Sequence, residues 1–214
     1  MNRLLVLVEG QTEERFIKEV VQPHLWSSNV SAEPKIVMTK RVIGASSHKG
    51  GGDFGKAHAD ILRLLADTNA VAVSTFFDFY GFPKSLPGAG PDTFQDIDKL
   101  TAAIEATVSN PRFKAYLQKH EFEAFLFVDP QTTAVVAMQP DRAAALAAHR
   151  NGFTSAEDIN LGPETAPSKR IASTMGRYSK LLTGPVAAQR IGIQRLRADC
   201  PRFDTWMSWA ESLG

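Results

Sequence analysis

Two nearly continuous apolar runs mark the first half of the chain, at residues 4–8 and 71–77. Runs without polar alternation are typical of strands that a parallel sheet buries on both faces. Two further strands are expected at residues 36–43 and 112–117. Segments with helical spacing separate the four runs. This alternation predicts an α/β fold with a mainly parallel sheet and helices on both of its faces.

The helices between these strands are predicted from apolar residues that recur at helical spacing. They are expected at residues 13–22, 56–67 and 93–108. Thr12 is a plausible N-cap for the first helix, because a short polar side chain can accept hydrogen bonds from the first turn. Pro23 is expected to end that helix, since proline cannot donate the next backbone hydrogen bond.

The pattern changes beyond about residue 130, where it becomes mostly helical and rich in alanine. We therefore predict two parts. Residues 1–130 form the sheet-containing core, which would carry the catalytic groups. Residues 131–214 form a helical C-terminal extension that packs on this core.

Charge is balanced overall but unevenly distributed. The formal net charge is +1, so no global field indicates a nucleic-acid or membrane partner. Residues 165–198, however, carry seven Lys or Arg residues and no Asp or Glu. Such a stretch is either a solvated helix face or a surface that faces an anion.

The single cysteine, Cys200, excludes a disulfide framework and a cysteine-rich zinc site. This usage fits a reducing compartment, so we expect a cytoplasmic protein. No apolar run approaches the roughly 20 residues of a membrane span. The chain enters a strand at once, so we expect neither a signal peptide nor a membrane partner.

Acidic residues follow two of the predicted strands. Glu9 comes directly after the first run and Asp78 directly after the run at 71–77. Because the carboxyl ends of parallel strands share one edge, the two carboxylates converge if their strands are neighbours. Such oxygens suit Mg²⁺ or Mn²⁺, and a metal-activated water could then hydrolyse a phosphodiester. The alternative for each acid, and for Glu13 in the first helix, is a turn or helix-start role.

A third polar group lies in the segment K-H-E-F-E-A-F, which contributes Lys119, His120, Glu121 and Glu123. On a strand both glutamates would share one face, whereas on a helix they diverge. Apolar residues at helical spacing favour the helix, so one acid is expected at the site, and Glu121 is preferred because it is nearer the strand end. Lys119 could neutralise a phosphate, and His120 is more simply a packed or surface residue.

Basic residues supply candidate contacts to nucleic-acid phosphates, which give affinity without reading sequence. The candidates are Lys169, Arg170, Lys56 and Arg195. Lys56 also ends the segment Gly50–Lys56, which has the G-x-x-x-x-G-K spacing of a phosphate-binding loop. Ala57 stands where that motif needs Ser or Thr to hold Mg²⁺, so nucleotide binding is kept as an alternative.

The segments V-E-G-Q-T-E, with Glu9, and F-F-D-F-Y-G, with Asp78, resemble the Toprim domain of topoisomerases, primases and related nucleases over residues 1–125. The resemblance implies a Toprim/Rossmann-like sheet. That family places a Glu after its first strand and an Asp-x-Asp after a later one. Tyr80 replaces the second aspartate and is a poor Mg²⁺ ligand, because its ordinary pKa is about 10. The second carboxylate must then come from Glu121 or Glu123.

The segments H-E-F-E-A-F-L-F, A-P-S-K-R-I and I-G-I-Q-R-L-R-A-D-C-P-R-F-D-T-W resemble a bacterial family of Toprim-like proteins that are often encoded beside an ATPase in mobile or phage-defence gene clusters. The resemblance implies a metal-dependent nuclease of DNA or RNA that acts as a defence effector with an ATPase partner. Glu9, Asp78 and Glu121 would hold the metal, with Glu13 and Glu123 assisting.

Two other functions are compatible with the sequence. One is a non-catalytic binding subunit, in which the acids hold a structural ion or pair with Lys and Arg. The other is a nucleotide-binding protein that uses the segment Gly50–Lys56. The sequence leaves the oligomeric state open.

Overall fold

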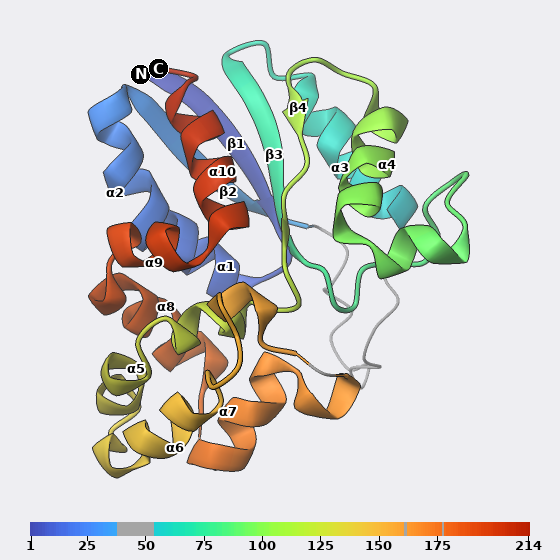
Figure 1. Ribbon diagram of the computed structural model, residues 1–214. Coiled ribbons are helices and arrows are strands. Elements are labelled where there is room, and N and C mark those ends of the chain that lie inside the picture. The colour runs from blue at the N-terminus through green and yellow to red at the C-terminus, as the bar shows by residue number, and fades with distance from the viewer. Residues whose placement is uncertain (38–53, 161, 177) are drawn as a thin grey trace, which may run out of the picture.

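The computed structural model describes residues 1–37, 54–160, 162–176 and 178–214. Its centre is a parallel sheet in the order β2–β1–β3–β4, with β5 also beside β3 (Figure 1). The strands are β1 (Asn2–Val8), β2 (Val30–Ile36), β3 (Ala70–Asp78), β4 (Phe113–Lys114) and β5 (Leu117–Gln118). The predicted α/β fold with a mainly parallel sheet is thereby confirmed.

β1 occupies the middle of the sheet, which explains its continuous apolar run. Leu4, Val6 and Val8 point into one hydrophobic cluster, and Leu5 and Leu7 point into a second. Successive side chains of a strand face opposite sides, so both faces of β1 are buried. β3 is its direct neighbour, with Val8 paired to Phe76 near their carboxyl ends.

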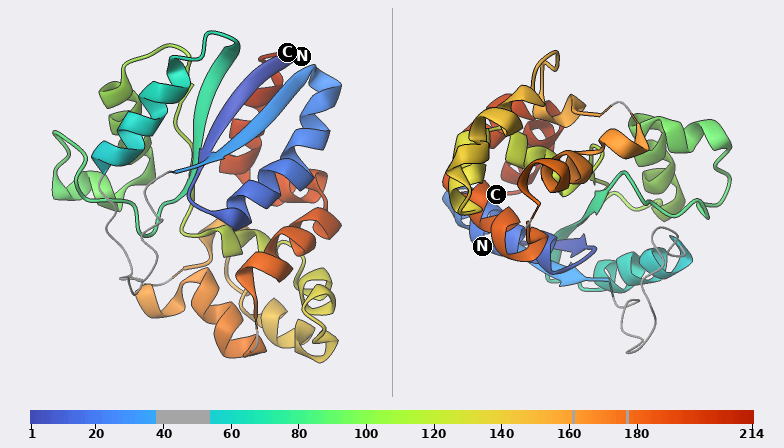
Figure 2. Two further views of the ribbon diagram at one scale, coloured as in Figure 1. Left: turned by 180° about the vertical axis from the view of Figure 1, so that it is seen from behind. Right: turned by 90° about the horizontal axis from the view of Figure 1, so that it is seen from below.

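Helices cover both faces of the sheet, as Figures 1 and 2 show. On one face lie α1 (Gln11–Phe16), α2 (Gln22–Leu25) and α10 (Pro201–Glu211), and on the other lie α3 (Phe54–Leu65) and α4 (Ile97–Val108). Shorter turns complete this part: the π-helical turn η1 (Ile17–Val21) and the 3₁₀ turns η2 (Trp26–Ser28), η4 (Pro91–Gln95) and η5 (Phe122–Phe127).

The second strand was predicted wrongly at residues 36–43. β2 covers Val30–Ile36, paired in register with all of β1, and residues 38–43 lie outside the described residues. β2 is an edge strand with a partly exposed, polar sequence that includes Pro34. Edge strands tolerate proline and need no continuous apolar run, so the hydrophobic pattern did not reveal it.

The predicted strand at 112–117 is split into β4 and β5, both beside β3. Between them the hydroxyl of Thr75 donates to the carbonyl of Tyr116 and accepts from its backbone N–H, both at 3.0 Å. The Thr75 side chain thus takes part in the pairing at Tyr116, beside a long backbone hydrogen bond of 3.4 Å from the N–H of Phe77, and the regular strand is interrupted there.

The first helix also differs from its prediction. Gly10 is its N-cap, whereas Thr12 lies buried in the first turn of α1. Pro23 does not end the helix, because the path continues through η1 into α2. Pro23 lies in the first turn of α2, a place where the missing N–H costs least.

The C-terminal extension lies beyond the carboxyl ends of the strands and then returns to the sheet through α10 (Figures 1 and 2). Its elements are α5 (Pro130–Val136), α6 (Ala143–Ala148), α7 (Pro167–Met175), α8 (Lys180–Ile191), α9 (Ile193–Asp199), α10 and the 3₁₀ turns η6 (Pro140–Arg142), η7 (Ala156–Asp158) and η8 (Pro163–Thr165). Its elements therefore both cover the carboxyl edge and complete one face of the sheet.

One hydrophobic core joins the extension to the sheet. Phe203 of α10 is fully buried and its ring packs against those of Phe16 and Phe125, with centroids 5.7 and 5.0 Å away. The indole N–H of Trp206 donates to the hydroxyl of Ser74 in β3 at 2.9 Å, within the core. The parts predicted at 1–130 and 131–214 therefore share one core on this face.

Replacement of Phe203 by alanine tests this shared core. We expect Phe203→Ala to lower the free energy of unfolding by about 3–5 kcal/mol, because it removes a buried ring and leaves a cavity. The matched change Leu182→Ala removes a side chain that is 66% exposed, and should cost under about 0.5 kcal/mol. Urea denaturation of both variants measures the difference, and equal losses would contradict a shared core.

Candidate functional site

The two acids that follow the central strands meet at the carboxyl edge of the sheet. The Oε1 atom of Glu9, just after β1, accepts a hydrogen bond of 2.9 Å from the backbone N–H of Asp78 at the end of β3. The two residues are distant in sequence, but β1 and β3 are parallel neighbours. The convergence that the sequence predicted for these two acids is therefore present.

Asp78 divides its two oxygens between two partners. Oδ1 accepts a hydrogen bond of 2.8 Å from the backbone N–H of Phe122, at the start of η5. Oδ2 lies 3.4 Å from the ammonium nitrogen of Lys180, the first residue of α8. One oxygen thus fixes the local structure, while the other faces a cation.

Lys180 joins three carboxylates that come from three different elements. Its Nζ lies 3.2 Å from Glu123 Oε2 in η5, 3.4 Å from Asp78 Oδ2 in β3 and 3.6 Å from Glu13 Oε1 in α1. The acidic side chains are 4%, 13% and 7% exposed, whereas that of Lys180 is 37% exposed. We call Lys180, Glu123, Asp78, Glu13 and the adjacent Glu9 the acidic cluster.

The preference for Glu121 over Glu123 was wrong for this cluster. Glu123 is buried beside Lys180, whereas Oε2 of Glu121 accepts a hydrogen bond of 2.9 Å from the backbone N–H of Ser168 in the first turn of α7. The two acids do diverge, as a helical turn requires. Glu121 immediately precedes η5 and has an extended backbone conformation. Its side chain therefore points toward α7, although Glu121 is the nearer of the two acids to the strand end.

Burial and the repulsion of neighbouring carboxylates raise the pKa values of two acids of the cluster, Asp78 and Glu123. Burial raises the pKa of Asp78 well above its ordinary value; Lys180 opposes this rise, and the charges of Glu9, Glu13 and Glu123 add to it. Burial likewise raises the pKa of Glu123, with Lys180 opposing and Glu121 adding.

The pKa of Lys180 is also raised, but here the neighbouring charges and not burial cause the rise. Burial lowers its pKa, but the charges of Asp78, Glu123 and Glu13 outweigh burial, so the net pKa is raised and the ammonium stays protonated. One ammonium faces several carboxylates. The acidic cluster therefore holds more carboxyl groups than the ammonium of Lys180 can pair with.

Two glycines permit the close approach of the elements. A Cβ atom on Gly184 of α8 would lie 3.0 Å from a ring carbon of Phe122 and 3.4 Å from the hydroxyl of Tyr178. The bare backbone lets α8 pack on η5, and this brings Lys180 to the carboxylates. A Cβ on Gly10 would lie 3.4 Å from Glu13 Oε2, so Gly10 keeps space beside that oxygen.

The remaining predicted residues of the K-H-E-F-E-A-F segment and Tyr80 lie beside the cluster. Lys119 pairs with Asp158 at 2.5 Å, so its charge already has a carboxylate partner.

Burial, together with the positive charge of Lys119, lowers the pKa of His120 to about 4. His120 is a packed residue in a left-handed conformation, in contact with the Tyr80 ring. Burial and the charge of Glu121 raise the pKa of Tyr80, so its phenol stays neutral.

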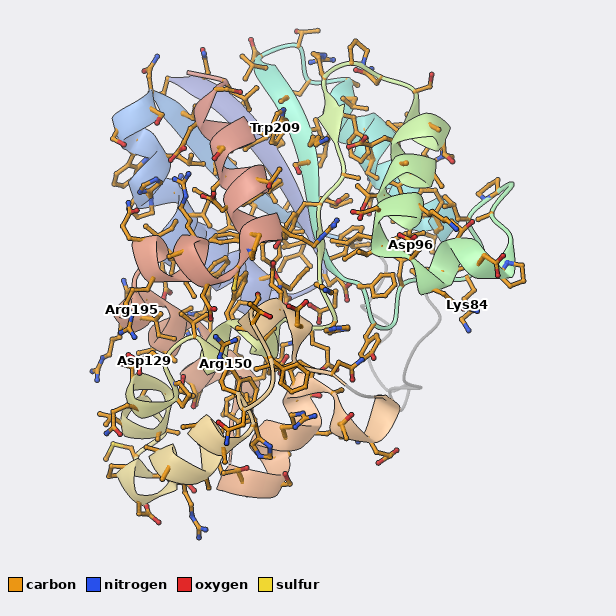
Figure 3. All side chains as sticks on the ribbon, in the orientation of Figure 1. Lys84, Asp96, Asp129, Arg150, Arg195 and Trp209 are labelled. Atoms are coloured by element: carbon orange, nitrogen blue, oxygen red, sulfur yellow. The ribbon has the colours of Figure 1, made fainter. Side chains whose placement is uncertain are left out.

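The predicted phosphate contacts differ in how they are placed. The guanidinium of Arg170 donates to the carbonyl of Thr165 at 2.7 Å and lies over the ring of Phe153. Arg195 of α9 pairs with Asp129 before α5, on the side of the molecule away from α3 and α4 (Figure 3). Arg170 and Arg195 thus have intramolecular partners.

Lys169 of α7 and Lys56 of α3 are exposed. In the alternative phosphate-binding loop, Gly50 lies outside the described residues, whereas Gly55 and Lys56 already belong to α3. Most of the predicted phosphate-binding loop, residues 50–53, therefore lies outside the described residues, and nucleotide binding there stays a prediction.

The oxygens of the cluster can be compared with what a divalent ion requires. Within the described ranges, no group of three or more His, Cys, Asp or Glu side chains is arranged to hold a metal ion. The Lys180 ammonium lies where the carboxylates approach one another. Among these residues, Oε2 of Glu123 is buried and has no hydrogen-bond partner, although Lys180 Nζ is 3.2 Å away as an ion pair. This oxygen and the neighbouring carboxylates are the type of ligand that a hard cation such as Mg²⁺ prefers.

Lys180 is the residue that the sequence analysis missed. The only available signal was its position in the acid-free stretch 165–198, where it was one of seven cations. Nothing local distinguishes it from its neighbours. Its role depends on α8 reaching a strand end about a hundred residues earlier in the chain.

These features define a class: an α/β protein with an acidic, lysine-bridged site at the carboxyl edge of a parallel sheet. Residues 8–211 match the family described as domain of unknown function DUF4276, so the chain belongs to that family. The match begins at the last residue of β1 and includes the other strands, the helical extension as far as the end of α10, and the whole acidic cluster. Neither the curated proteins nor the solved structures yield a match. None of the described helices has the length and apolar character needed to cross a membrane.

The raised pKa values of Asp78 and Glu123 predict how stability depends on pH without divalent ions. Both groups bind protons more readily in the folded than in the unfolded state, whose values are near 3.8 and 4.5. Between those values and the raised folded ones, the folded protein holds more protons, so their contribution to the free energy of unfolding falls as pH rises. Glu123→Gln removes one such group and should gain stability relative to the wild type as pH rises.

Urea denaturation at several pH values from about 5 to 8 measures this difference. Glu14→Gln is the matched control, because Glu14 lies next to Glu13 on α1 and pairs with the exposed Lys18. A Glu123→Gln curve parallel to that of the wild type would contradict the assignment.

Proposed function

We propose that the protein is a metal-dependent nuclease that hydrolyses phosphodiester bonds of DNA or RNA. The observation that carries the proposal is the meeting of Glu9, Glu13, Asp78 and Glu123 at the carboxyl edge of the sheet, with the ammonium of Lys180 among them. Active sites of open parallel sheets collect at this edge. The proposed relationship to the Toprim domain rests on Glu9 and Asp78, which are two of these four acids.

The cluster offers oxygens for Mg²⁺ or Mn²⁺ from Asp78, Glu123 and Glu13. A divalent ion bound there would polarise the phosphate and lower the pKa of a water nucleophile. Asp78 Oδ1 remains engaged with the N–H of Phe122, which holds the carboxylate in place. Glu9 fixes the end of β3 through its hydrogen bond with the N–H of Asp78, and so holds the two acidic residues at the same edge.

The substrate would lie along the outer side of the cluster. Lys169 is exposed one residue after Ser168, whose N–H binds Glu121 near the cluster. An exposed lysine there suits a nucleic-acid phosphate, since such contacts supply affinity without sequence selectivity. Lys56 is the second exposed candidate. The ATPase partner and the role as a defence effector stay predictions from the family resemblance.

A second function is favoured by one specific observation, the ion pairs of Lys180. An ammonium that already balances part of the cluster is what a non-catalytic binding subunit would retain for stability. In that case the acids need no metal, and the protein would bind a partner or nucleic acid without cleaving it. Metal binding and cleavage separate the two functions.

Cleavage assays test the proposal. The pure protein is incubated with plasmid, single-stranded DNA and tRNA, with Mg²⁺ or Mn²⁺ and with a chelator. We expect metal-dependent cleavage that Asp78→Asn and Glu13→Gln each lower by at least about 100-fold, because each removes a charged group that the metal site needs. Glu14→Gln, one residue further along α1, should cleave as the wild type does.

Two results would count against the nuclease. Cleavage that persists in Glu9→Gln and Asp78→Asn would show that another site or a contaminant is responsible. Absence of both cleavage and metal binding in the wild type would favour the non-catalytic subunit.

A further inference from the structure

The ammonium of Lys180 and its carboxylate partners differ in how firmly they are held. Asp78 is fixed by a backbone N–H, and Asp78, Glu13 and Glu123 are nearly inaccessible. Lys180 reaches them from a side chain that is 37% exposed. A lysine ammonium sits on a flexible four-carbon stem, so it is the partner that can leave without rearranging the backbone.

The position of Lys180 on its own helix is unfavourable for a cation. It is the first residue of α8, after the N-cap Ser179. The helix macrodipole favours negative charge at this end, so it does not hold the ammonium there. The carboxylates hold it, together with the ring of Phe122, whose centroid lies 5.9 Å from Nζ.

Glu123 shows independently that the ammonium of Lys180 does not satisfy all the carboxylate oxygens around it. The side chain is 4% exposed, and its Oε2 faces the cluster. In the part of the chain that the structure describes, that oxygen has no hydrogen-bond partner, because the contact with Lys180 is an ion pair of 3.2 Å without hydrogen-bond geometry. A buried carboxylate oxygen in this state can bind a cation that approaches from another direction.

We propose that Lys180 is an internal counter-ion that occupies the metal-free cluster and that a divalent cation must displace. This inference rests on the metal site of the proposed function. The freed ammonium would remain at the exposed side of the cluster, where a substrate phosphate approaches. Lys180 therefore limits the affinity of the cluster for the metal. When the metal enters, the ammonium leaves its carboxylate partners and pairs with the substrate phosphate instead.

The inference makes metal affinity depend on the charge of Lys180. Lys180→Met keeps the aliphatic stem and removes the competitor, so Mn²⁺ should bind at least about tenfold tighter, since the ion no longer displaces a unit charge at close range. Lys180→Arg keeps the charge and should bind no tighter than the wild type. The control Lys114→Met removes a surface lysine that pairs with Glu105, and should leave Mn²⁺ affinity unchanged.

Two measurements on these variants test it. Calorimetric titration with Mn²⁺ gives the affinities. Thermal unfolding should place the midpoint of metal-free Lys180→Met about 5 °C below that of the wild type, because several carboxylates then lack a counter-charge. Saturating Mn²⁺ should raise this midpoint by more than it raises that of the wild type.

A third measurement needs no variant and so remains decisive if Lys180→Met does not fold. Reductive methylation with mass spectrometry reports how readily each lysine of the wild type reacts. Mg²⁺ should raise the modification rate of Lys180 several-fold, because displacement exposes the amine and removes its carboxylate partners. The rate at Lys114 should not change.

The outcomes distinguish the inference from the proposed function. If the wild type binds Mn²⁺ and cleaves nucleic acid, but Lys180→Met binds no tighter or Mg²⁺ leaves the reactivity of Lys180 unchanged, the inference is wrong and the nuclease stands. If Lys180→Met binds Mn²⁺ more tightly and no form cleaves nucleic acid, the counter-ion stands and the nuclease fails. If no form binds Mn²⁺, both fail.

Discussion

Buried carboxylates need a cation, and this constraint governs the carboxyl edge of the sheet. Asp78, Glu123 and Glu13 each place a carboxylate oxygen 3.2–3.6 Å from the ammonium of Lys180. An unpaired buried charge costs several kcal/mol, so buried carboxylates either take up protons, as the raised pKa values of Asp78 and Glu123 indicate, or pair with a cation. Lys180 supplies one charge, and the cluster carries more than one. The excess is what a divalent ion would balance.

The fold delivers these groups from four separate elements. The parallel pairing of β1 and β3 brings the Glu9 carboxylate to the backbone N–H of Asp78. The Oδ1 atom of Asp78 in turn accepts a hydrogen bond from the N–H of Phe122, the first residue of η5. The extension then covers this edge, and Gly184 lets α8 approach closely enough for Lys180 to reach the acids. Sheet and extension thus share a hydrophobic core and also share the site.

The sequence predicted the parts that depend on local pattern. Continuous apolar runs identified β1 and β3, and the acids at their ends were expected to meet because of how parallel strands align. The edge strand β2 was misplaced because a partly exposed strand with a proline lacks that pattern. The choice between Glu121 and Glu123 failed because it depended on the backbone direction at the start of η5, which spacing alone does not determine. Lys180 could not be predicted, since its role depends on long-range packing.

The most direct test of the central claim is a crystal structure of the protein grown or soaked with Mn²⁺, with the ion located by its anomalous scattering. The account predicts a manganese ion about 2.0–2.4 Å from carboxylate oxygens of Asp78 and Glu123, with the ammonium of Lys180 moved out of contact with them. A structure in which Lys180 stays between these acids at saturating Mn²⁺, with no manganese bound to them, would contradict it.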